Sequence, residues 1–185
     1  MSDNDDLVFI DDERQPVEEP NEARPWFVLV ADDDDGVHEV TRFALATRSI
    51  LGRPLALLHA HSGAEALVVL RQQPDIAVIL LDVVMESDDA GLRLVEAIRS
   101  DQSLANTRII LRTGQPGHAP EAETISRYDI NDYRTKAELS ERRLLASLTM
   151  AIRSFDQLQR LDAHRRGLEM IVSASNQLNA KPGVR

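Results

Sequence analysis

Acidic residues follow two apolar segments of this sequence at positions that suggest chemistry. Asp82 ends the run IAVILLD, which begins at Ile76, and the aspartates Asp32 to Asp35 follow the run FVLVA over residues 27–31. Continuous apolar runs of this length are typical of strands buried on both faces of a parallel sheet. One interpretation of Asp82 is that it only caps the next turn. An unpaired buried carboxylate is costly, however, and ligands bind at the carboxyl ends of such strands.

Three of these carboxylates, Asp32, Asp33 and Asp82, would repel one another at a shared sheet edge. A hard divalent cation between them makes the cluster favourable, and oxygen ligands with room for water suit Mg²⁺. Thr113 and Lys136 follow the next two apolar segments. A hydroxyl and an ammonium facing the metal would complete a phosphoryl cradle, with a carboxylate as the in-line nucleophile. Each of these residues alone is common on protein surfaces, but five at successive strand ends favour such a site.

The segments between these residues alternate between strand and helix patterns, which predicts a parallel sheet with helices on both faces. We expect a flavodoxin-like (βα)5 doubly wound sheet of order 2-1-3-4-5 with a long C-terminal helical extension. The first helix should place Val37, Val40, Phe43, Ala44 and Thr47 on one side. The expected strands cover residues 27–31, 55–60, 76–83, 108–111 and 132–134. The expected helices cover residues 37–48, a segment from the capping box Ser62-Gly-Ala-Glu65 to before Pro74, a segment containing Leu92 to Ile98, and residues 120–128.

Composition excludes several classes of protein. The 185 residues include no cysteine, so disulfides and thiolate metal sites are excluded and a cytoplasmic protein is expected. No segment resembles a signal peptide or approaches a membrane span. The net charge of −10 argues against direct nucleic-acid binding. Residues 1–25 carry nine acids and three prolines, which predicts an acidic disordered leader.

The sequence after Lys136 has a long helical pattern. Its apolar positions form a stripe with a phase shift near Leu158. We expect an α/β domain over residues 26–147 and a helix or linker over residues 148–185. A packed terminal helix, a helical linker and a dimer interface are all consistent with the pattern. The stripe comprises Leu144, Leu148, Ile152 and Phe155, followed by Leu158, Leu161, Leu168, Ile171, Val172 and Leu178.

The segments VLVADDDD, ILLDVVM, IILRTG and NDYRTK resemble the receiver domains of bacterial two-component response regulators, over roughly Pro25 to Ser147. The resemblance implies that Asp82 accepts a phosphoryl group from a histidine kinase or a phosphotransfer protein. It implies that Asp33 binds Mg²⁺ directly and that Asp32 acts largely through water. Residues implied to have other roles are Val84 (a carbonyl ligand of the metal), Thr113 and Lys136 (phosphoryl contacts) and Tyr133 (an aromatic switch).

This sequence departs from the family pattern at three places. Glu86 stands where the family often has proline, and Ala137 replaces the proline usual after the lysine, which leaves open the cis peptide common there. About five extra residues lie near residues 49–54. The segments ILLDVVMESDDAGLRLV, IILRTGQPG, YDINDYRTK and RRGLEMIVSAS resemble a subfamily in which the receiver precedes a GAF-like domain, and often an HD-type cyclic di-GMP phosphodiesterase. That output domain would be absent from this chain, and a homodimer through the C-terminal helix is expected.

Two other classes of function remain as alternatives. A magnesium-dependent phosphohydrolase resembling the haloacid dehalogenases would carry a second acid two residues after the nucleophile, where this sequence has Val84. A receiver-like interaction module that never binds phosphate would not need all five reactive groups. Arg160, Arg165 and Arg166 alone fit a solvated helix face better than a DNA-binding output. We therefore expect a phosphorylatable switch and not an enzyme.

Overall fold

The computed structural model of the chain describes residues 24–73, 75–114, 121–128, 130–136 and 140–179. Residues 1–23 of the expected acidic leader, Ala137 and the last six residues lie outside these ranges, so the expectations for them stay predictions. The helices α1 (Asp35–Leu45), α2 (Gly63–Gln72), α3 (Ala90–Ser100), α4 (Glu121–Tyr128) and α5 (Glu141–Asn179) surround one sheet, and a short 3-10 helix, η1 (Gln102–Leu104), precedes the fifth strand. No helix in the described part of the chain is long and apolar enough to span a membrane.

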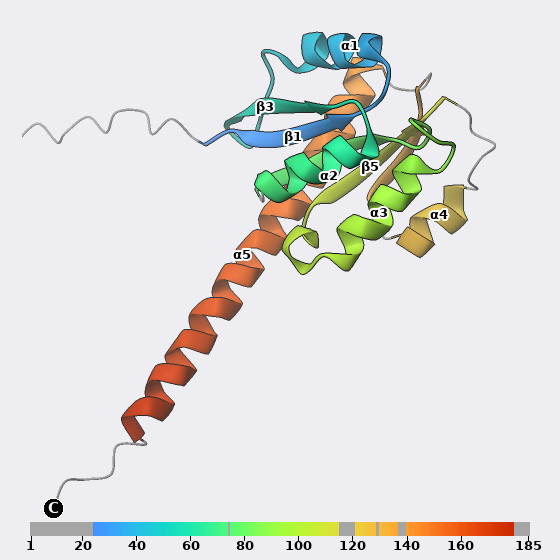
Figure 1. Cartoon of the computed structure of the whole chain (residues 1–185). Helices are drawn as coiled ribbons and strands as arrows, with labels where there is room; N and C mark the ends of the chain where they lie inside the picture. The colour runs from blue at the N-terminus through green and yellow to red at the C-terminus, as the bar shows by residue number, and fades with distance from the viewer. Residues whose placement is uncertain (1–23, 74, 115–120, 129, 137–139, 180–185) are drawn as a thin grey trace, which may run out of the picture.

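The sheet has six strands in the order β2-β3-β1-β4-β5-β6 (Figure 1). The five strands from β3 to β6 are mutually parallel, which confirms the expected flavodoxin-like order 2-1-3-4-5. The sixth, β2, is antiparallel to β3 at the edge of the sheet. The strands are β1 (Trp26–Ala31), β2 (Ser49–Ile50), β3 (Arg53–Ala60), β4 (Ile76–Asp82), β5 (Arg108–Thr113) and β6 (Asp132–Thr135).

The extra residues near position 50 form this antiparallel hairpin. Its two-residue loop is Leu51-Gly52, and both residues have positive φ, at 51° and 74°. Two successive positive φ values are characteristic of type I′ turns, whose twist matches that of paired strands. Glycine adopts this conformation without strain, whereas leucine does so at a cost. The insertion therefore extends the sheet edge and leaves the carboxyl edge unchanged.

Alternating strand residues build two apolar layers. Leu29 and Leu81 belong to the layer under α2, α3 and α4, whereas Val28 and Leu80 belong to the layer under α1 and α5. Every residue of β4 is buried, as expected for the central strand of a doubly covered parallel sheet. The sheet therefore holds the ends of β1 and β4 in a fixed relation, and these ends carry the acidic residues.

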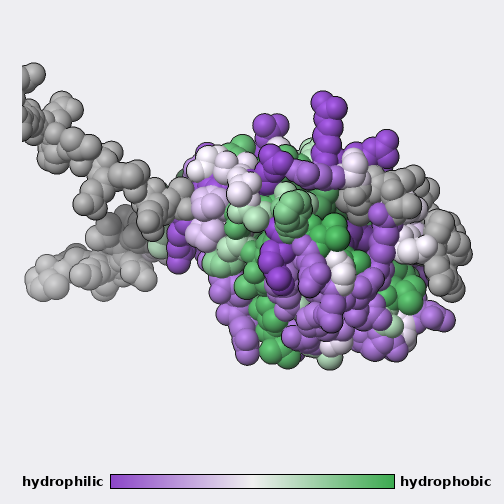
Figure 2. Space-filling model, turned by 90° about the horizontal axis from the view of Figure 1, so that it is seen from above, coloured by the Kyte–Doolittle hydropathy of each residue, from purple (hydrophilic) through white to green (hydrophobic). Residues whose placement is uncertain are grey.

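The apolar positions that the sequence groups on one side of α1 are not the positions that the helix buries most deeply. The helix buries His38, Thr41 and Leu45, whereas Val40 and Phe43 are 70% and 89% exposed. Polar side chains can occupy the inner face because each has a partner: His38 Nε2 lies 2.8 Å from the carbonyl of Asp32, and Thr41 accepts a hydrogen bond from a strand arginine. Apolar spacing alone therefore does not identify the buried side of this helix. Figure 2 shows hydrophobic surface between hydrophilic side chains in the view from above.

The start of α2 confirms half of the predicted capping box. Ser62 caps the helix by accepting a hydrogen bond from the Glu65 N–H at 3.2 Å. The Glu65 carboxylate returns one residue further than the motif requires, because it accepts from the His61 N–H at 2.7 Å. The two-residue loop between β3 and α2, residues 61–62, is thereby fixed beside the carboxyl edge of the sheet.

Helix α5 is continuous across the expected domain boundary at residues 147/148. Leu144, Leu148, Ile152 and Phe155 are buried against the sheet, as the first part of the apolar stripe predicts. Asn106 Nδ2 donates to Asp162 at 2.6 Å, which extends the contact with the globular part. Beyond this point the helix projects away from the sheet (Figure 1).

Candidate functional site

Three carboxylates meet at the carboxyl edge of the sheet. Asp32 and Asp33 directly follow β1, and Asp82 is the last residue of the neighbouring strand β4. One oxygen from each lies within 4.8 Å of the others. Asp32 and Asp82 are buried, whereas Asp33 is exposed. Two buried acids behind one exposed acid form a half-open site, which a solvated cation can reach from one side.

Lys136 supplies a positive charge to this cluster. It follows β6, and its Nζ lies 2.7 Å from Asp82 Oδ2 and 3.1 Å from Asp32 Oδ1. The lysine therefore bridges the two buried acids and leaves the exposed acid, Asp33, without this cation. Because an ammonium is a compact point charge on a flexible stem, Lys136 can also follow an anion that is added to either carboxylate.

A second cation at this edge, Arg112, was not predicted from the sequence. It is the penultimate residue of β5, is 4% exposed, and is paired in register with Asp82. Its Nη2 lies 3.4 Å from Asp32 Oδ2, and its Nη1 donates to Thr41 Oγ1 at 3.3 Å. The signal was an arginine inside the apolar run RIILRT. A charge in a buried strand requires a partner, and the nearest candidates were the acids at the adjacent strand ends.

The charges shift one another's proton affinities. Burial raises the pKa of Asp82 above its ordinary value, against the opposing effect of Lys136. Burial alone would lower the pKa of Lys136, but its hydrogen bond and charge interactions with Asp82 and Asp32 outweigh this and raise it. Lys136 therefore stays charged, whereas the ionised form of Asp82 is disfavoured in the metal-free chain. A further cation near Asp82 would relieve that penalty.

The remaining predicted residues lie around this cluster in different ways. Thr113 is buried at the end of β5, in register with Thr135 of β6. Tyr133 is buried in the layer that α4 covers. Val84 lies in the loop after β4, and its N–H lies 3.4 Å from Asp82 Oδ1. These positions are compatible with the predicted roles, but the roles themselves depend on a phosphoryl group and stay predictions.

Glu86, which departs from the family pattern, has a structural role. Its carboxylate accepts a hydrogen bond from the N–H of Gly63, the first residue of α2, with both oxygens at 3.2 Å. A carboxylate is favourable at a helix N-terminus because the first N–H groups have no partner within the helix. Glu86 thus ties the loop after Asp82 to α2, which a proline at this position could not do.

Gly91 allows α3 to approach the strand that carries Asp82. The Gly91 N–H donates to the Val83 carbonyl at 3.0 Å. A Cβ at Gly91 would overlap with the Asp82 carbonyl oxygen and would lie 2.8 Å from the Val83 Cα. Any side chain here therefore pushes α3 away from the end of β4.

We predict that Gly91→Ala lowers the free energy of unfolding by about 1–3 kcal/mol or more, because the added methyl group overpacks the backbone behind Asp82. Gly167→Ala in α5 is the control, since a Cβ there meets no atom within 4 Å. That control should raise helix stability by about 1 kcal/mol. Urea unfolding of both variants checks this, and equal stability of Gly91→Ala and the parent would contradict the close approach.

The donor set fits Mg²⁺ by its chemistry. All candidate ligands are oxygens, and no thiol or imidazole belongs to the cluster of Asp32, Asp33 and Asp82. Asp32 already forms ion pairs with Lys136 and Arg112 and accepts a hydrogen bond from the N–H of Asp34. Asp33 and Asp82 would therefore hold the ion directly, with water in the other positions, and Asp32 would act from behind.

The fold and the site together define a class: a doubly wound α/β domain with an acidic cluster and a lysine at the carboxyl edge of its sheet. Residues 28–149 match the family model described as the response regulator receiver domain. Since this match covers more than half of the chain, the chain belongs to that family and contains a receiver domain of two-component signalling. Residues 148–185 match a second model, described as a domain of unknown function, DUF3369.

The chain is also similar to individual proteins, and its likeness to the solved structures concerns the fold. The chain is 42% identical over 151 residues to 3'3'-cGAMP-specific phosphodiesterase 2 of Vibrio cholerae, covering 82% of this chain and 29% of that protein. The chain thus spans less than a third of that relative. Among solved structures, the signal receiver domain of an HD domain-containing protein from Pseudomonas fluorescens Pf-5 has a TM-score of 0.64 at 21% identity, covering 74% of this chain and 93% of that one. A receiver domain from Clostridium thermocellum has a TM-score of 0.62 at 19% identity, covering 72% and 98%.

Proposed function

We propose that this receiver domain accepts a phosphoryl group on Asp82, from a histidine kinase or a phosphotransfer protein, in a Mg²⁺-dependent reaction. The observation that carries the proposal is the contact between Lys136 Nζ and Asp82 Oδ2 at 2.7 Å, beside two further acids. Asp82 is the central member of the cluster because it ends the middle strand and contacts the lysine. The proposed setting is the cytoplasm, where phosphohistidine donors are made.

In the proposed reaction, a carboxylate oxygen of Asp82 attacks phosphorus in line with the bond from phosphorus to the donor's imidazole nitrogen. An acyl phosphate bond forms, the P–N bond breaks, and the nitrogen leaves with the electron pair and takes up a proton. Lys136 moves from the Asp82 carboxylate to a phosphoryl oxygen and balances its charge. Bound Mg²⁺ supplies further charge neutralisation. Asp33 and Asp82 would hold that ion, while Asp32 keeps Lys136 in reach.

Phosphorylation is proposed to act through Thr113 and Tyr133. A phosphoryl group adds about −1.5 to −2 charge and strong acceptor oxygens, which draw the Thr113 hydroxyl inward. This movement would vacate space for the Tyr133 ring and change the surface of α4, β6 and α5. Both side chains are buried, so the proposed change would require repacking around them. If Tyr133 only packs the sheet edge, NMR shifts at Tyr133 will not change when beryllofluoride is added.

The downstream output is proposed to act on a cyclic dinucleotide. This rests on the 42% identity to a cyclic dinucleotide phosphodiesterase and on the resemblance to receivers that precede GAF-like and HD-type domains. The receiver itself is proposed to be a switch and not an enzyme. We also propose that α5 carries the signal and mediates a homodimer.

The proposed chemistry is tested by incubating the chain with acetyl phosphate and Mg²⁺. Intact mass should rise by one phosphoryl group, and hydroxylamine should remove it because the product is an acyl phosphate. Absence of a mass increase under these conditions, with acetyl phosphate in large excess, would contradict the proposal. Labelling that survives hydroxylamine would place the phosphoryl group on a hydroxyl instead.

Metal binding gives a separate prediction. Asp33→Ala removes one of the two proposed direct ligands and should weaken Mg²⁺ binding by about tenfold or more in calorimetric titration. Asp75→Ala is the control, because Asp75 is an exposed acid next to the opposite end of β4. Phosphorylation of Asp33→Ala should fall in parallel with metal binding. If Asp33→Ala binds Mg²⁺ like the parent, the acidic pair has been misassigned.

A further inference from the structure

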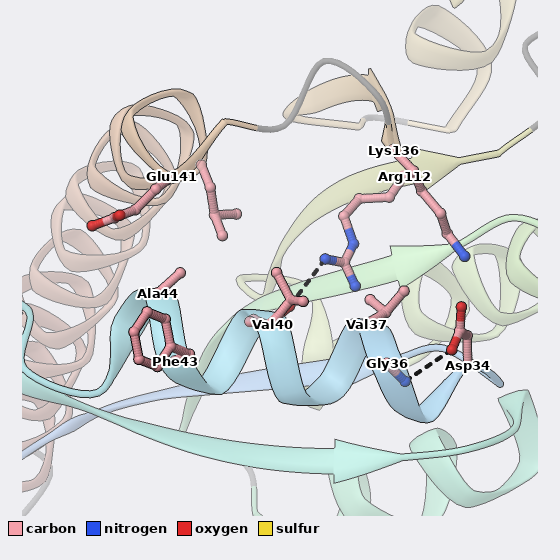
Figure 3. A pocket seen from close by; sticks show the side chains of 11 residues that line it. Asp34, Gly36, Val37, Val40, Phe43, Ala44, Arg112, Lys136 and Glu141 are labelled. Carbon is pink, nitrogen blue, oxygen red and sulfur yellow. Dashed lines mark hydrogen bonds between the residues drawn. The ribbon is translucent and has the colours of Figure 1, made fainter.

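Arg112 is a buried cation that the proposed phosphoryl-transfer chemistry does not use. It lies on the α1 and α5 side of β5, and its guanidinium points across a cavity of about 440 Å³ towards α1 (Figure 3). Its two terminal nitrogens contact Asp32 and Thr41. Its Nε has no hydrogen-bond partner in the part of the chain that the structure describes. A guanidinium in this position is costly unless its charge is balanced.

The charges of the side chains around Asp32 balance one another. Asp32 and Asp82 bring two negative charges, and Lys136 and Arg112 bring two positive charges. These four charges therefore cancel before any metal binds, and the exposed Asp33 adds one further negative charge. Asp32 holds both cations at once, Lys136 on Oδ1 and Arg112 on Oδ2. Because an arginine stays protonated at any ordinary pH, this charge is permanent.

We propose that Arg112 is the resident counter-ion of Asp32, which holds the acidic cluster together in the metal-free chain and lowers its affinity for Mg²⁺. The inference rests on the proposed metal-binding function. An ion bound next to Asp82 would lie near the positive charge of Arg112, which is on the other side of Asp32. The two positive charges would repel each other across this partly buried site. Arg112 is thus a positioning residue: it acts on the metal through Asp32 and leaves Asp33 and Asp82 to bind the ion.

Two consequences follow, and they have opposite signs. Removing the guanidinium leaves Asp32 buried with one cation, so the metal-free chain should lose stability. The same removal makes the site more negative, so Mg²⁺ should bind more tightly, by about threefold to tenfold. A residue with a merely structural role would lower stability and leave the dissociation constant unchanged or raise it.

The chain offers a matched control in the same strand. Arg108 is 7% exposed, lies on the same face of β5, and donates to the carbonyls of Ala105 and Asn106 at the opposite end of the strand from the acids. Arg108→Gln therefore removes an equally buried guanidinium far from the metal. Arg112→Gln removes the one beside Asp32. Arg112→Lys keeps the charge and loses the fork that contacts Asp32 and Thr41.

The experiment is calorimetric titration of the metal-free full chain with Mg²⁺ alone, together with thermal unfolding without and with metal. We expect Arg112→Gln to melt at a lower temperature without metal and to bind Mg²⁺ about threefold to tenfold more tightly. Arg108→Gln should melt lower and keep the dissociation constant of the parent. Arg112→Lys should bind within about twofold of the parent. If Arg112→Gln is unfolded without metal, the parent and all variants are titrated in an osmolyte such as sucrose, at a concentration that keeps this variant folded.

Unchanged or weaker Mg²⁺ binding by Arg112→Gln, with a parent that binds Mg²⁺, would overturn this inference and leave the proposed function intact. Equal tightening by Arg112→Lys would also overturn it, because the charge is kept in that variant. A parent that shows no Mg²⁺ binding sensitive to Asp33→Ala would refute the proposed metal site, and this inference with it.

Discussion

Replacing Asp82 by asparagine should abolish phosphorylation by acetyl phosphate, with the labelling rate falling at least about a hundredfold. The amide has the same shape but lacks the anionic oxygen that attacks phosphorus. It also removes one of two proposed direct metal ligands and the strongest partner of Lys136. Intact mass after incubation with acetyl phosphate and Mg²⁺ measures the effect. Asp75→Asn, an exposed acid next to the other end of β4, should label like the parent.

The same variant carries its own test of folding. Because burial raises the pKa of Asp82, protonation of this carboxyl is more favourable in the folded chain than in the unfolded chain. This contribution to stability is complete in acid, below the ordinary aspartate pKa of 3.8, and is lost as pH rises through the raised pKa. At neutral pH the ionised carboxylate therefore destabilises the metal-free chain. Asp82→Asn mimics the neutral form. It should have a higher melting temperature than the parent at pH 7 and the same melting temperature as the parent in strong acid.

These two results separate chemistry from folding. Asp82→Asn should be more stable without metal and yet unable to accept a phosphoryl group. Mg²⁺ should stabilise the parent, because it relieves the burial penalty of the carboxylate, and should stabilise the variant less. Labelling of Asp82→Asn at the parental rate would remove Asp82 as the acceptor. A lower melting temperature of the metal-free variant at pH 7 would show instead that Lys136 outweighs burial.

The sheet and its acidic edge could be predicted because they depend on local patterns. β4 is apolar along its whole length and ends in a charge, which is the pattern of a buried parallel strand whose carboxyl end carries a site. Sheet topology then brings the ends of β1 and β4 together, so Asp32, Asp33 and Asp82 meet without further information. The β2 hairpin was located as an insertion but not as a strand, since two residues give no periodic signal.

The inner face of α1 and the role of Arg112 were not predictable in this way. His38 and Thr41 contact His59 of β3 and Arg112 of β5, which lie 21 and 71 residues away in the sequence. No periodicity within α1 records those partners. Arg112 likewise finds Asp32 across 80 residues. A prediction from apolar periodicity misses polar residues whose partners are far away in the sequence. In this chain such pairs lie near the functional edge of the sheet.

Helix α5 shows why its apolar stripe changes phase near Leu158. The residues before that point face the sheet, and Phe155 is the last of them to be buried. Beyond it the exposed apolar residues lie on the opposite side of the helix, with Leu161, Leu168 and Ile171 at 63%, 64% and 68% exposure. The apolar stripe therefore lies on two faces of α5. One face packs against the sheet of the receiver domain, and the other is not covered by any described residue.

The second face has heptad spacing. We call it the dimer face, and it comprises Met150, Gln157, Leu161, His164, Leu168 and Ile171, which are separated by seven, four, three, four and three residues. That spacing is the a and d pattern of helices that pack along a common axis. Two polar members make a loose pair of helices more consistent with the sequence than a tight coiled coil. A second copy of α5 fits as the partner, because its dimer face has the same heptad spacing.

We predict that the chain is a dimer through this face and that the double variant Leu168→Asp/Ile171→Asp is a monomer. Burying two carboxylates per helix in an apolar contact costs more than the contact gains. The matched control is Ala163→Asp/Met170→Asp, which adds the same charge at exposed positions on a different side of the helix. Sedimentation velocity across a range of concentrations should show a dimer for the parent and the control. A parent that stays monomeric, or a control that dissociates as readily as the double variant, would contradict the assignment of this face.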